Sequence, residues 1–530
     1  MKKMFVGLLS FLTLEINAQV PVIEWQKCYG GSNYEDAWCL INTSDSGYLF
    51  SGDTYSNNGS VFGNHGMNDL WVVKSDGTGN LQWQICLGGT NDDLGTKAIQ
   101  VSDGGYLISG ATNSNDGDVS GNHGGSDTWV IKLDSMGSIQ WQKCFGGSSY
   151  EDRTQSIIET NDHDFIITSS TLSNDGDVSG NHDVNFWDIW IIKIDNNGSL
   201  LLQKCIGGTQ NDHPTDLFQT REGNFLLTAE IHSSDGDITT TTYGGWTDFW
   251  ISLLDTNLNI IWQSVYGGSG DDLARSAKQT RDGGFVIGGS TTSNDFDVSG
   301  NHSIISQDYW LIKIDSTGDL QWQKCLGGMH FEDAFSIDTT LDGGILIAGI
   351  SESEDGDITA AVDTLSSNWW VVKLDSVGTI LWDKSLGGSD QEEAQAIRTT
   401  PDGGCIILGY TSSNDLDVTG GGYHGGQDFW AVKLSSTNVG IFANQNLVTD
   451  FTLYLAPVTN NLTLNFFANG NERIQLQLLD MTGRVLLSKP LGVTEGFNQQ
   501  EVHVGSLSAG MYIVRLATEC GSVSKKLVTQ

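Results

Sequence analysis

The chain has 530 residues, of which 65 are acidic and 26 basic, so its formal net charge at neutral pH is −39. This length allows two to four average domains. The charge argues against a nucleic-acid-binding protein, because phosphate recognition depends on clustered Lys and Arg, and against docking on an anionic membrane. With 66 glycines, 17 tryptophans and only 5 prolines, the composition indicates a folded, turn-rich β-protein.

The first residues predict a secretory signal peptide. Met1–Lys3 form a basic start, residues 4–14 form a short apolar run, and Ala18 is a small residue before a cleavage point. The apolar run is shorter than the ~20 residues that span a membrane, and no other segment of the sequence is long and apolar enough to do so. We expect the mature protein to begin near Gln19.

A Gly-Gly pair recurs along most of the chain and defines an internal repeat. The pairs begin at Gly30, Gly88, Gly146, Gly207, Gly267, Gly327 and Gly387, at spacings of 58 to 61 residues. Seven units of about sixty residues therefore fill positions 22–434.

Each unit contains four segments that read as strands. In the second unit they are 97–101, 106–111, 127–133 and 139–145, and Asp103-Gly104-Gly105 forms a tight turn between the first two. Seven units of four strands predict an all-β fold, a seven-bladed β-propeller. The structural alternative is a solenoid, which would need capping repeats, and the sequence shows none.

The two ends of the repeat region are out of register. The last unit stops after its third strand, 428–434, and a segment with the sequence of the missing fourth strand lies at 22–28. We therefore expect the N-terminal strand to complete the last blade and close the ring. The units resemble the seven-bladed β-propeller repeats of bacterial surface proteins, through D-x-W-V-x-K-L-D, the following G-x-x-x-W, and G-G-S-x-x-D. That resemblance implies a fold and not an activity.

The last eighty residues differ in composition from the repeats. Residues 446–530 are neutral and contain no tryptophan, and short alternating strands in them are broken by Thr482-Gly483 and Ala509-Gly510. This pattern predicts a small immunoglobulin-like β-sandwich. These residues resemble the type A C-terminal sorting domain of the Bacteroidota type IX secretion system through D-x-x-G-R (480–484), L-x-x-G-x-Y (507–512) and K-K-L (525–527). Residues 455–458 stand where the family has a Y-P-N-P-like motif.

The resemblance implies export across the outer membrane by the type IX machinery, and then removal of residues 451–530 with surface attachment or release. We therefore expect a secreted or cell-surface protein. The predicted domains are a signal peptide at 1–18, the propeller at 19–435, a linker at 436–450 and the sorting domain at 451–530.

Residues that recur in every unit are expected to be scaffold. The third-strand tryptophan occurs seven times, and we expect it to pack between blades; carbohydrate stacking is the alternative. Five of the eight cysteines share one repeat position, where other units have Val265 and Ser385. That position therefore favours a small buried side chain over a disulfide or a metal ligand.

Pairs of aspartates separated by one residue recur in the polar loop between the second and third strands. They are Asp116/Asp118, Asp175/Asp177, Asp235/Asp237, Asp295/Asp297, Asp355/Asp357 and Asp415/Asp417. Calcium prefers carboxylate ligands, but the pairs do not match the EF-hand loop, and aspartate also forms turns by bonding its own backbone. Both interpretations, calcium sites and turn structure, stay open.

The connection after each Gly-Gly pair adds more acids to the same end of the blade. They are Glu35, Asp36, Asp92, Asp93, Glu151, Asp152, Asp212, Asp271, Asp272, Glu332, Asp333, Asp390, Glu392 and Glu393. We therefore predict that 26 of the propeller's 58 acids crowd one face, where they would attract divalent cations or a basic partner. Asn-His pairs in the loops, at His65, His123, His182 and His302, with His424 in a related loop, indicate loop hydrogen bonding; a metal site is the alternative.

No catalytic motif of the G-x-S-x-G, H-E-x-x-H or P-loop type is present. We therefore predict a non-enzymatic propeller that binds or adheres to an extracellular glycan or protein. A polysaccharide-active hydrolase or lyase is the alternative, because departures from the repeat cluster in units three and four. These are His163, Asp183, Trp187, His213, Asp216, His232 and Trp246.

Overall fold

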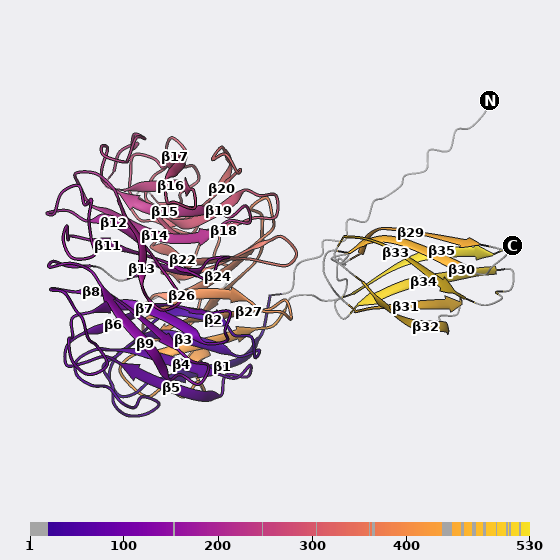
Figure 1. Cartoon of the computed structure of the whole chain (residues 1–530), viewed down its shortest axis with the longest axis horizontal. Coiled ribbons are helices and arrows are strands. Elements are labelled where there is room, and N and C mark those ends of the chain that lie inside the picture. The colour runs from indigo at the N-terminus through magenta and orange to yellow at the C-terminus, as the bar shows by residue number, and fades with distance from the viewer. Residues whose placement is uncertain are drawn as a thin grey trace. The chain divides into compact units, whose positions relative to one another are not determined.

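The chain forms two compact units, Met1–Thr437 and Asn438–Gln530 (Figure 1). The computed structural model describes residues 20–151, 154–245, 247–303, 305–359, 361–362, 366–436, 448–456, 461–468, 473–480, 484–493, 496–504, 507, 510–518 and 521–529. The predicted signal peptide at 1–18 lies outside the described residues, and so does most of the predicted linker at 436–450.

The first unit consists of seven four-stranded antiparallel sheets, called blades one to seven. Blades one to three are β2 (Glu35–Asn42), β3 (Tyr48–Thr54), β4 (Asp69–Ser75), β5 (Leu81–Leu87); β6 (Asp93–Gln100), β7 (Tyr106–Thr112), β8 (Asp127–Leu133), β9 (Ile139–Phe145); and β10 (Ser156–Glu159), β11 (Phe165–Thr171), β12 (Asp188–Ile194), β13 (Leu200–Ile206). Blades four and five are β14 (Asp212–Gln219), β15 (Phe225–Ile231), β16 (Asp248–Leu254), β17 (Ile260–Tyr266); and β18 (Asp272–Gln279), β19 (Phe285–Thr291), β20 (Asp308–Ile314), β21 (Leu320–Leu326). Blades six and seven are β22 (Glu332–Thr339), β23 (Ile345–Ser351), β24 (Asn368–Leu374), β25 (Ile380–Leu386); and β26 (Glu392–Thr399), β27 (Cys405–Thr411), β28 (Asp428–Leu434), β1 (Ile23–Tyr29), with a 3-10 turn at Leu416–Val418.

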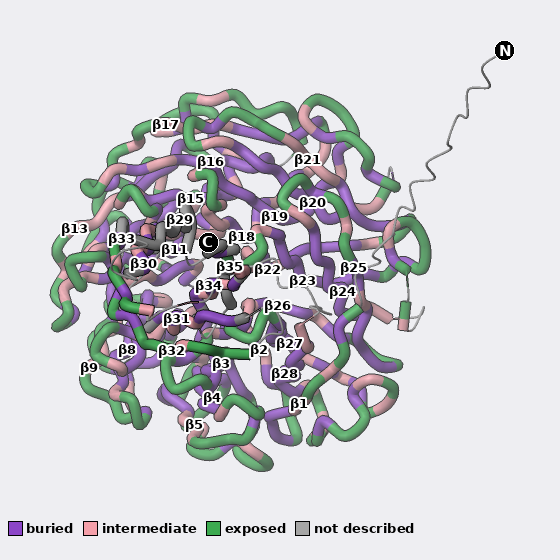
Figure 2. Tube along the Cα trace, turned by 90° about the vertical axis from the view of Figure 1, so that its right-hand side faces the viewer, coloured by how far each residue is buried: buried purple, intermediate pink, exposed green. Residues whose placement is uncertain are grey.

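The sheets are arranged radially as a seven-bladed β-propeller, which confirms the predicted fold. Figure 2 shows β2, β18, β22 and β26 near the centre and β5, β9, β13, β17 and β21 at the periphery. Each inner strand contacts the inner strand of the next blade, and β2 of blade one also contacts β26 and β27 of blade seven. Exposed residues concentrate in the loops and outer strands, and buried residues in the two middle strands of each blade.

The first strand of the chain lies in the last blade. β1 pairs antiparallel with β28, so the strand order of the seventh sheet is β1-β28-β27-β26. The Trp430 indole N–H donates to the side-chain oxygen of Gln26 at 2.9 Å. The Ser435 backbone N–H donates to the Val22 carbonyl at 2.9 Å, and the Val22 N–H donates to Ser435 Oγ at 3.1 Å.

The third strand of each blade is buried on both faces because neighbouring blades cover it. Its tryptophan is fully buried in all seven blades, as the predicted packing role requires; these residues are Trp71, Trp129, Trp190, Trp250, Trp310, Trp370 and Trp430. Rings from adjacent blades meet, as in Trp430 with Trp369 at 4.2 Å between centroids. The shared cysteine position is buried, and the cysteines among the described residues are free thiols.

The third-strand lysines point to the opposite end of the blade from the Asp-x-Asp loops. Lys132 is 1% exposed, and its Nζ lies 2.7 Å from Asp103 Oδ2 in the hairpin between β6 and β7. The same pairing joins Lys74 to Asp45 and Lys433 to Asp402. These ion pairs hold the hairpin ends of the blades.

The innermost strand begins earlier than the sequence predicts in every blade except blade three, where β10 begins at Ser156. In blade two the strand starts at Asp93 rather than at residue 97. The Asp93 carboxylate accepts the Gly89 N–H at 2.6 Å and the Ser114 hydroxyl at 2.8 Å, and it also bonds Thr112. These bonds fix the segment after the Gly-Gly pair in extended form against β7.

The second unit is a β-sandwich, as predicted. One sheet contains β29 (Val448–Ala456), β30 (Asn461–Ala468) and β33 (Gly496–His503), and the other contains β32 (Val485–Gly492), β31 (Arg473–Asp480), β34 (Gly510–Thr518) and β35 (Gly521–Thr529). Apolar side chains from both sheets, such as Leu464, Phe466, Leu476 and Val514, form one buried core.

Candidate functional site

Two loops of each blade meet on one face of the propeller, which we call the loop face. The first aspartate of each Asp-x-Asp pair accepts the backbone N–H of the residue that follows the preceding Gly-Gly pair, at 2.7 to 2.9 Å. These first aspartates are Asp116, Asp175, Asp235, Asp295, Asp355 and Asp415. The second aspartate donates its own backbone N–H to the first glycine's carbonyl, at 2.8 to 3.1 Å. The pairs therefore clamp the connection between blades, in the manner that turn structure predicts.

The prediction of a crowded acidic face is right about the side, but eight of the acids are buried, namely one that recurs in every blade and Asp333, which is 4% exposed. The acid four residues after the second glycine of each pair is at most 1% exposed, and it accepts the N–H of that glycine at 2.6 to 3.1 Å. These buried residues are Glu35, Asp93, Glu151, Asp212, Asp272, Glu332 and Glu392. Their carboxylates stabilise the Gly-Gly connection instead of adding charge to the surface.

The loop histidines connect adjacent blades. The imidazole Nδ1 of His65, His123, His182, His302 and His424 lies 2.6 to 2.8 Å from Oδ2 of the aspartate that begins the third strand. In four of them Nε2 faces the second aspartate of the Asp-x-Asp pair in the next blade, at 3.6 to 3.9 Å. This is the predicted loop hydrogen bonding.

The second aspartates of the pairs have different partners in different blades. Four of them face a histidine imidazole of the preceding blade, not a cluster of oxygen ligands; they are Asp118, Asp177, Asp237 and Asp357. Burial and the charge of Asp297 raise the pKa of the Tyr243 hydroxyl, and the Asp417 backbone carbonyl accepts the Gln26 side-chain amide at 2.5 Å.

Calcium at the Asp-x-Asp pairs stays a prediction. In the part of the chain that the structure describes, no group of three or more His, Cys, Asp or Glu residues could hold a metal ion. Among the same residues, no helix is long and apolar enough to cross a membrane.

The aspartates that begin the third strands are fully buried, and their environments are short of hydrogen-bond donors. Oδ1 has no hydrogen-bond partner among the described residues in Asp69, Asp127, Asp188, Asp248, Asp308 and Asp428. Burial raises the pKa of each of them, to about 6 for Asp428, which keeps its histidine.

Blade four lacks the loop histidine, and it contains a cavity of about 250 Å³ on the loop face. Its sequence has Thr241-Thr242 where other blades have Asn-His, and Ile231 where they have Thr or Ser. In blade three the corresponding Asn181 side chain is 7% exposed and bonds the Thr171 carbonyl at 3.0 Å. The loss of such a filling side chain leaves room in blade four.

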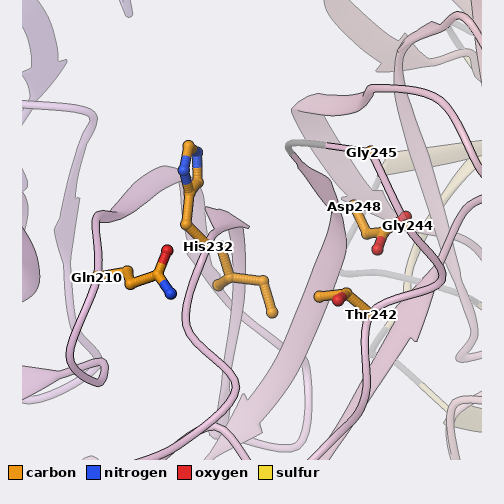
Figure 3. A pocket seen from close by; sticks show the side chains of 7 residues that line it. Gln210, His232, Thr242, Gly244, Gly245 and Asp248 are labelled. Atoms are coloured by element: carbon orange, nitrogen blue, oxygen red, sulfur yellow. The ribbon is translucent and has the colours of Figure 1, made fainter.

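The cavity, called here the blade-four cavity, has polar walls. It is lined by Gln210, Ile231, His232, Thr242, Gly244, Gly245 and Asp248. Figure 3 shows Gln210 and His232 on one side, and Thr242, Gly244 and Asp248 on the other. The His232 backbone N–H donates to the Asn211 carbonyl at 3.0 Å and to Asp212 Oδ1 at 3.1 Å, which holds this wall in place.

Asp248 has an unusual environment within the cavity. Burial raises its pKa to about 7, with further increases from the charges of Asp272, Asp297 and Asp271. The Tyr243 N–H donates to its Oδ2 at 2.9 Å. Asp248 is therefore a buried carboxyl that exchanges its proton near neutral pH.

Glycine forms the rim of the cavity for a steric reason. Gly245 has a φ of +68°, and a Cβ atom there would lie 2.0 Å from the Gly270 carbonyl oxygen in the next connection. A side chain at this position would push the loop away from blade five and change the opening.

The other departures in blades three and four do not gather at one point. His213 lies beside Trp187, at 5.9 Å between ring centroids, and its Nδ1 is 2.8 Å from Ser170 Oγ. His163 lies on the hairpin at the opposite end of blade three and bonds Glu159 at 2.8 Å. Asp216 accepts the Ala277 N–H and the Ser156 hydroxyl, both at 3.0 Å.

Two further departures complete the set. Asp183 accepts the Asn185 N–H within its own loop, and Trp246 lies outside the described residues. Of the departures that the structure describes, His232 alone lines the cavity. Sequence reasoning missed Asp248 because it occupies a repeated position; the signal that could have found it is the loss of Asn-His in the same unit.

Comparison with known families identifies the second unit. Residues 452–530 match the secretion system C-terminal sorting domain, which confirms the resemblance to the type IX sorting domain. The chain is therefore a secreted or cell-surface protein that the type IX machinery handles. A search of curated protein sequences found no match.

Solved structures with similar folds are distant. Kuenenia stuttgartiensis hydrazine synthase has 11% sequence identity and a TM-score of 0.44, over 69% of this chain and 91% of that chain. A puromycin hydrolase has 12% identity and a TM-score of 0.38, over 72% and 50%. A member of the duf4221 family from Bacteroides vulgatus has 10% identity and a TM-score of 0.34, over 79% and 98%. At this similarity they carry no argument about what the chain does.

Proposed function

We propose that the chain is a non-catalytic binding protein that the type IX system exports, and that its ligand contacts the loop face at the blade-four cavity. The partner we expect is an extracellular glycan or protein. One observation carries the proposal: the repeated loop architecture gives way to a concave polar cavity in blade four. Ligand sites are typically concave, with a few converging polar groups.

A binding array tests this function. The purified mature chain is screened against immobilised glycans and extracellular proteins, and the hits are repeated with His232→Ala and with Gln210→Ala. We expect at least one ligand whose binding falls about tenfold in both variants, equivalent to ~1.4 kcal/mol. His163→Asn, on the opposite end of blade three, is the matched control and should bind normally. Hits that are indifferent to both cavity variants would place the ligand elsewhere.

The second candidate is a polysaccharide-active hydrolase or lyase in blades three and four. It is favoured by Asp248, because a buried carboxyl with its pKa raised to about 7 has the property of a general acid. The test is cleavage of a glycan panel by the mature chain. Activity that disappears in Asp248→Asn or His213→Ala would support the enzyme, whereas binding without cleavage supports the first proposal.

We also propose the processing that the sorting domain implies, with a mature N-terminus near Gln19 and loss of the segment after about residue 445. Intact-mass measurement of the surface or medium form, from a host with the type IX system, tests this. A mature form that retains Lys525-Lys526 would contradict it.

Calcium at the Asp-x-Asp loops remains a proposal of its own. It is supported by the position of the pairs on the loop face, where the first aspartates of five pairs are exposed. We expect millimolar calcium to raise the melting temperature, by up to ~2.7 kcal/mol of stabilisation at a hundredfold excess over Kd. Asp116→Asn with Asp118→Asn should reduce the gain. A melting temperature unaffected by calcium and chelator would leave these residues as clamps of the connections.

A further inference from the structure

The blade-four cavity lies where a repeated interaction is incomplete. In five other blades, the loop histidine gives the third-strand aspartate both a backbone N–H and an imidazole nitrogen. In blade four, Tyr243 supplies only the backbone N–H to Asp248. The charge of Asp297 in the next blade acts on the Tyr243 hydroxyl, and Asp297 is the counterpart of the aspartate that histidine Nε2 faces elsewhere. The contact made by Nδ1 therefore has no counterpart from Tyr243.

Asp248 is left as a fully buried side chain that lines the cavity. Its Oδ1 has no hydrogen-bond partner among the described residues, as in the five blades with a loop histidine, but its Oδ2 accepts the Tyr243 N–H without the imidazole that those blades add. A buried carboxylate with a single donor is costly, and a second donor with positive charge offsets that cost best. A protonated nitrogen bound in the cavity would therefore supply the hydrogen bond that the Asp248 carboxylate lacks.

The surrounding charges favour a cation. Asp271, Asp272 and Asp297 all act on Asp248. Arg275, on the neighbouring strand β18, is held by Glu230 Oε1 at 3.0 Å and Asp333 Oδ2 at 3.3 Å, so its charge is already paired. The potential in the cavity is therefore negative.

We propose that the blade-four cavity binds a small organic cation, a protonated imidazole or amine group, in the place that the histidine imidazole holds in other blades. This inference rests on the proposed binding function and names the chemical class of the ligand group. An organic cation fits better than a metal ion, because the residues that line the cavity supply a single carboxylate, whereas calcium takes several oxygen ligands.

The test uses imidazole as the probe and the full mature chain in the presence of a chelator. Binding is followed by ligand-observed NMR at about pH 6.5, where about half of an imidazole with a pKa of ~6.5 is protonated. We expect a Kd on the order of 1 mM for so small a ligand. Pyrazole, a ring of the same size that stays neutral at this pH, should not bind.

Three variants locate the site. Asp248→Asn should weaken imidazole binding at least about tenfold, and the blade tolerates asparagine there because blade six has Asn368 at the same position. Tyr243→His should also abolish binding, because it supplies the missing imidazole from the chain itself. Asp69→Asn, in blade one where His65 is present, is the matched control and should bind imidazole as the unmodified chain does.

Equal binding of pyrazole, or imidazole binding that survives Asp248→Asn, would overturn the inference. So would calcium that displaces imidazole from the cavity, since a metal ion would then be the occupant. An array ligand that depends on His232 in a chain that does not bind imidazole would overturn the inference and leave the proposed function standing. If imidazole binds but no array ligand depends on His232 or Gln210, the proposed function is contradicted and the inference stands.

Discussion

Single residues at the blade junctions show how a carboxylate can be buried in a strongly acidic protein. Asp127 is fully buried and begins β8, and His123 supplies its Oδ2 with two donors, at 3.0 Å from the backbone and 2.7 Å from Nδ1. Burial lowers the pKa of His123, but the hydrogen bond to Asp127 and the nearby negative charges together outweigh burial, so the pKa of His123 is raised. The sequence predicts these histidines as loop hydrogen-bonding residues, but their partners lie on strands and in neighbouring blades, which spacing alone does not show.

Removal of one such histidine should destabilise the propeller. His123→Ala takes away the Nδ1 donor to a buried carboxylate, and we expect a loss of ~1–3 kcal/mol in the free energy of unfolding. The measurement is chemical denaturation at mildly acidic pH. His163→Asn is the control, because His163 is 68% exposed and has a φ of +64° that asparagine tolerates. An equal effect of both substitutions would contradict the role given to His123.

At the scale of strands, the repeat made the four-stranded blades predictable. Alternation, Asp-Gly turns and the Gly-Gly spacing gave the second, third and fourth strands of blade two within a residue of their bounds. The inner strand β6 was predicted too short because Asp93 reads as a loop residue, although its side chain is buried and bonded. The sequence did not predict the blade-four cavity, because the cavity arises where the Asn-His pair of the repeat is absent.

Deletion of β1 should expose the edge of β28. We expect removal of residues 19–28 to lower the melting temperature and to cost several kcal/mol, since the strand also covers Trp430. A milder variant, Gln26→Ala, leaves the Trp430 indole N–H without its acceptor and should cost ~1–3 kcal/mol. Calorimetry of the mature chain measures both. A deletion variant that melts at the same temperature would show that β1 does not stabilise the ring.

For the whole molecule, the buried carboxyls determine how stability depends on pH. Burial raises the pKa of Asp248 and Glu35 to about 7, and that of Asp272 and Asp428 to about 6. A raised pKa means that the folded state keeps a proton that the unfolded chain releases near pH ~4. Their contribution to the free energy of unfolding is therefore fully present below pH ~4 and is lost as the pH rises through about 6 to 7.

Other acids act in the opposite direction at low pH. Hydrogen bonds from Thr160 and Lys193 lower the pKa of Asp162 to about 2, so its contribution is present above pH ~4 and lost toward pH ~2. We therefore expect the melting temperature to be highest between about pH 4 and 6 and to fall toward about pH 8. A scan of melting temperature against pH checks this, and Asp248→Asn should reduce the fall. A melting temperature that rises from about pH 5 to 8 would contradict the prediction.

The hydrogen bonds between Val22 and Ser435 have a topological consequence. They bring together two points separated by 413 residues, so the ends of the propeller are neighbours in space. A short peptide joining them would turn the propeller into a circle without bending any blade, and it would remove about 6 kcal/mol of loop-closure entropy from the unfolded chain. New termini could then be opened at any exposed hairpin. The sorting domain could then be attached at a different blade, so that its attachment point is no longer restricted to the last blade.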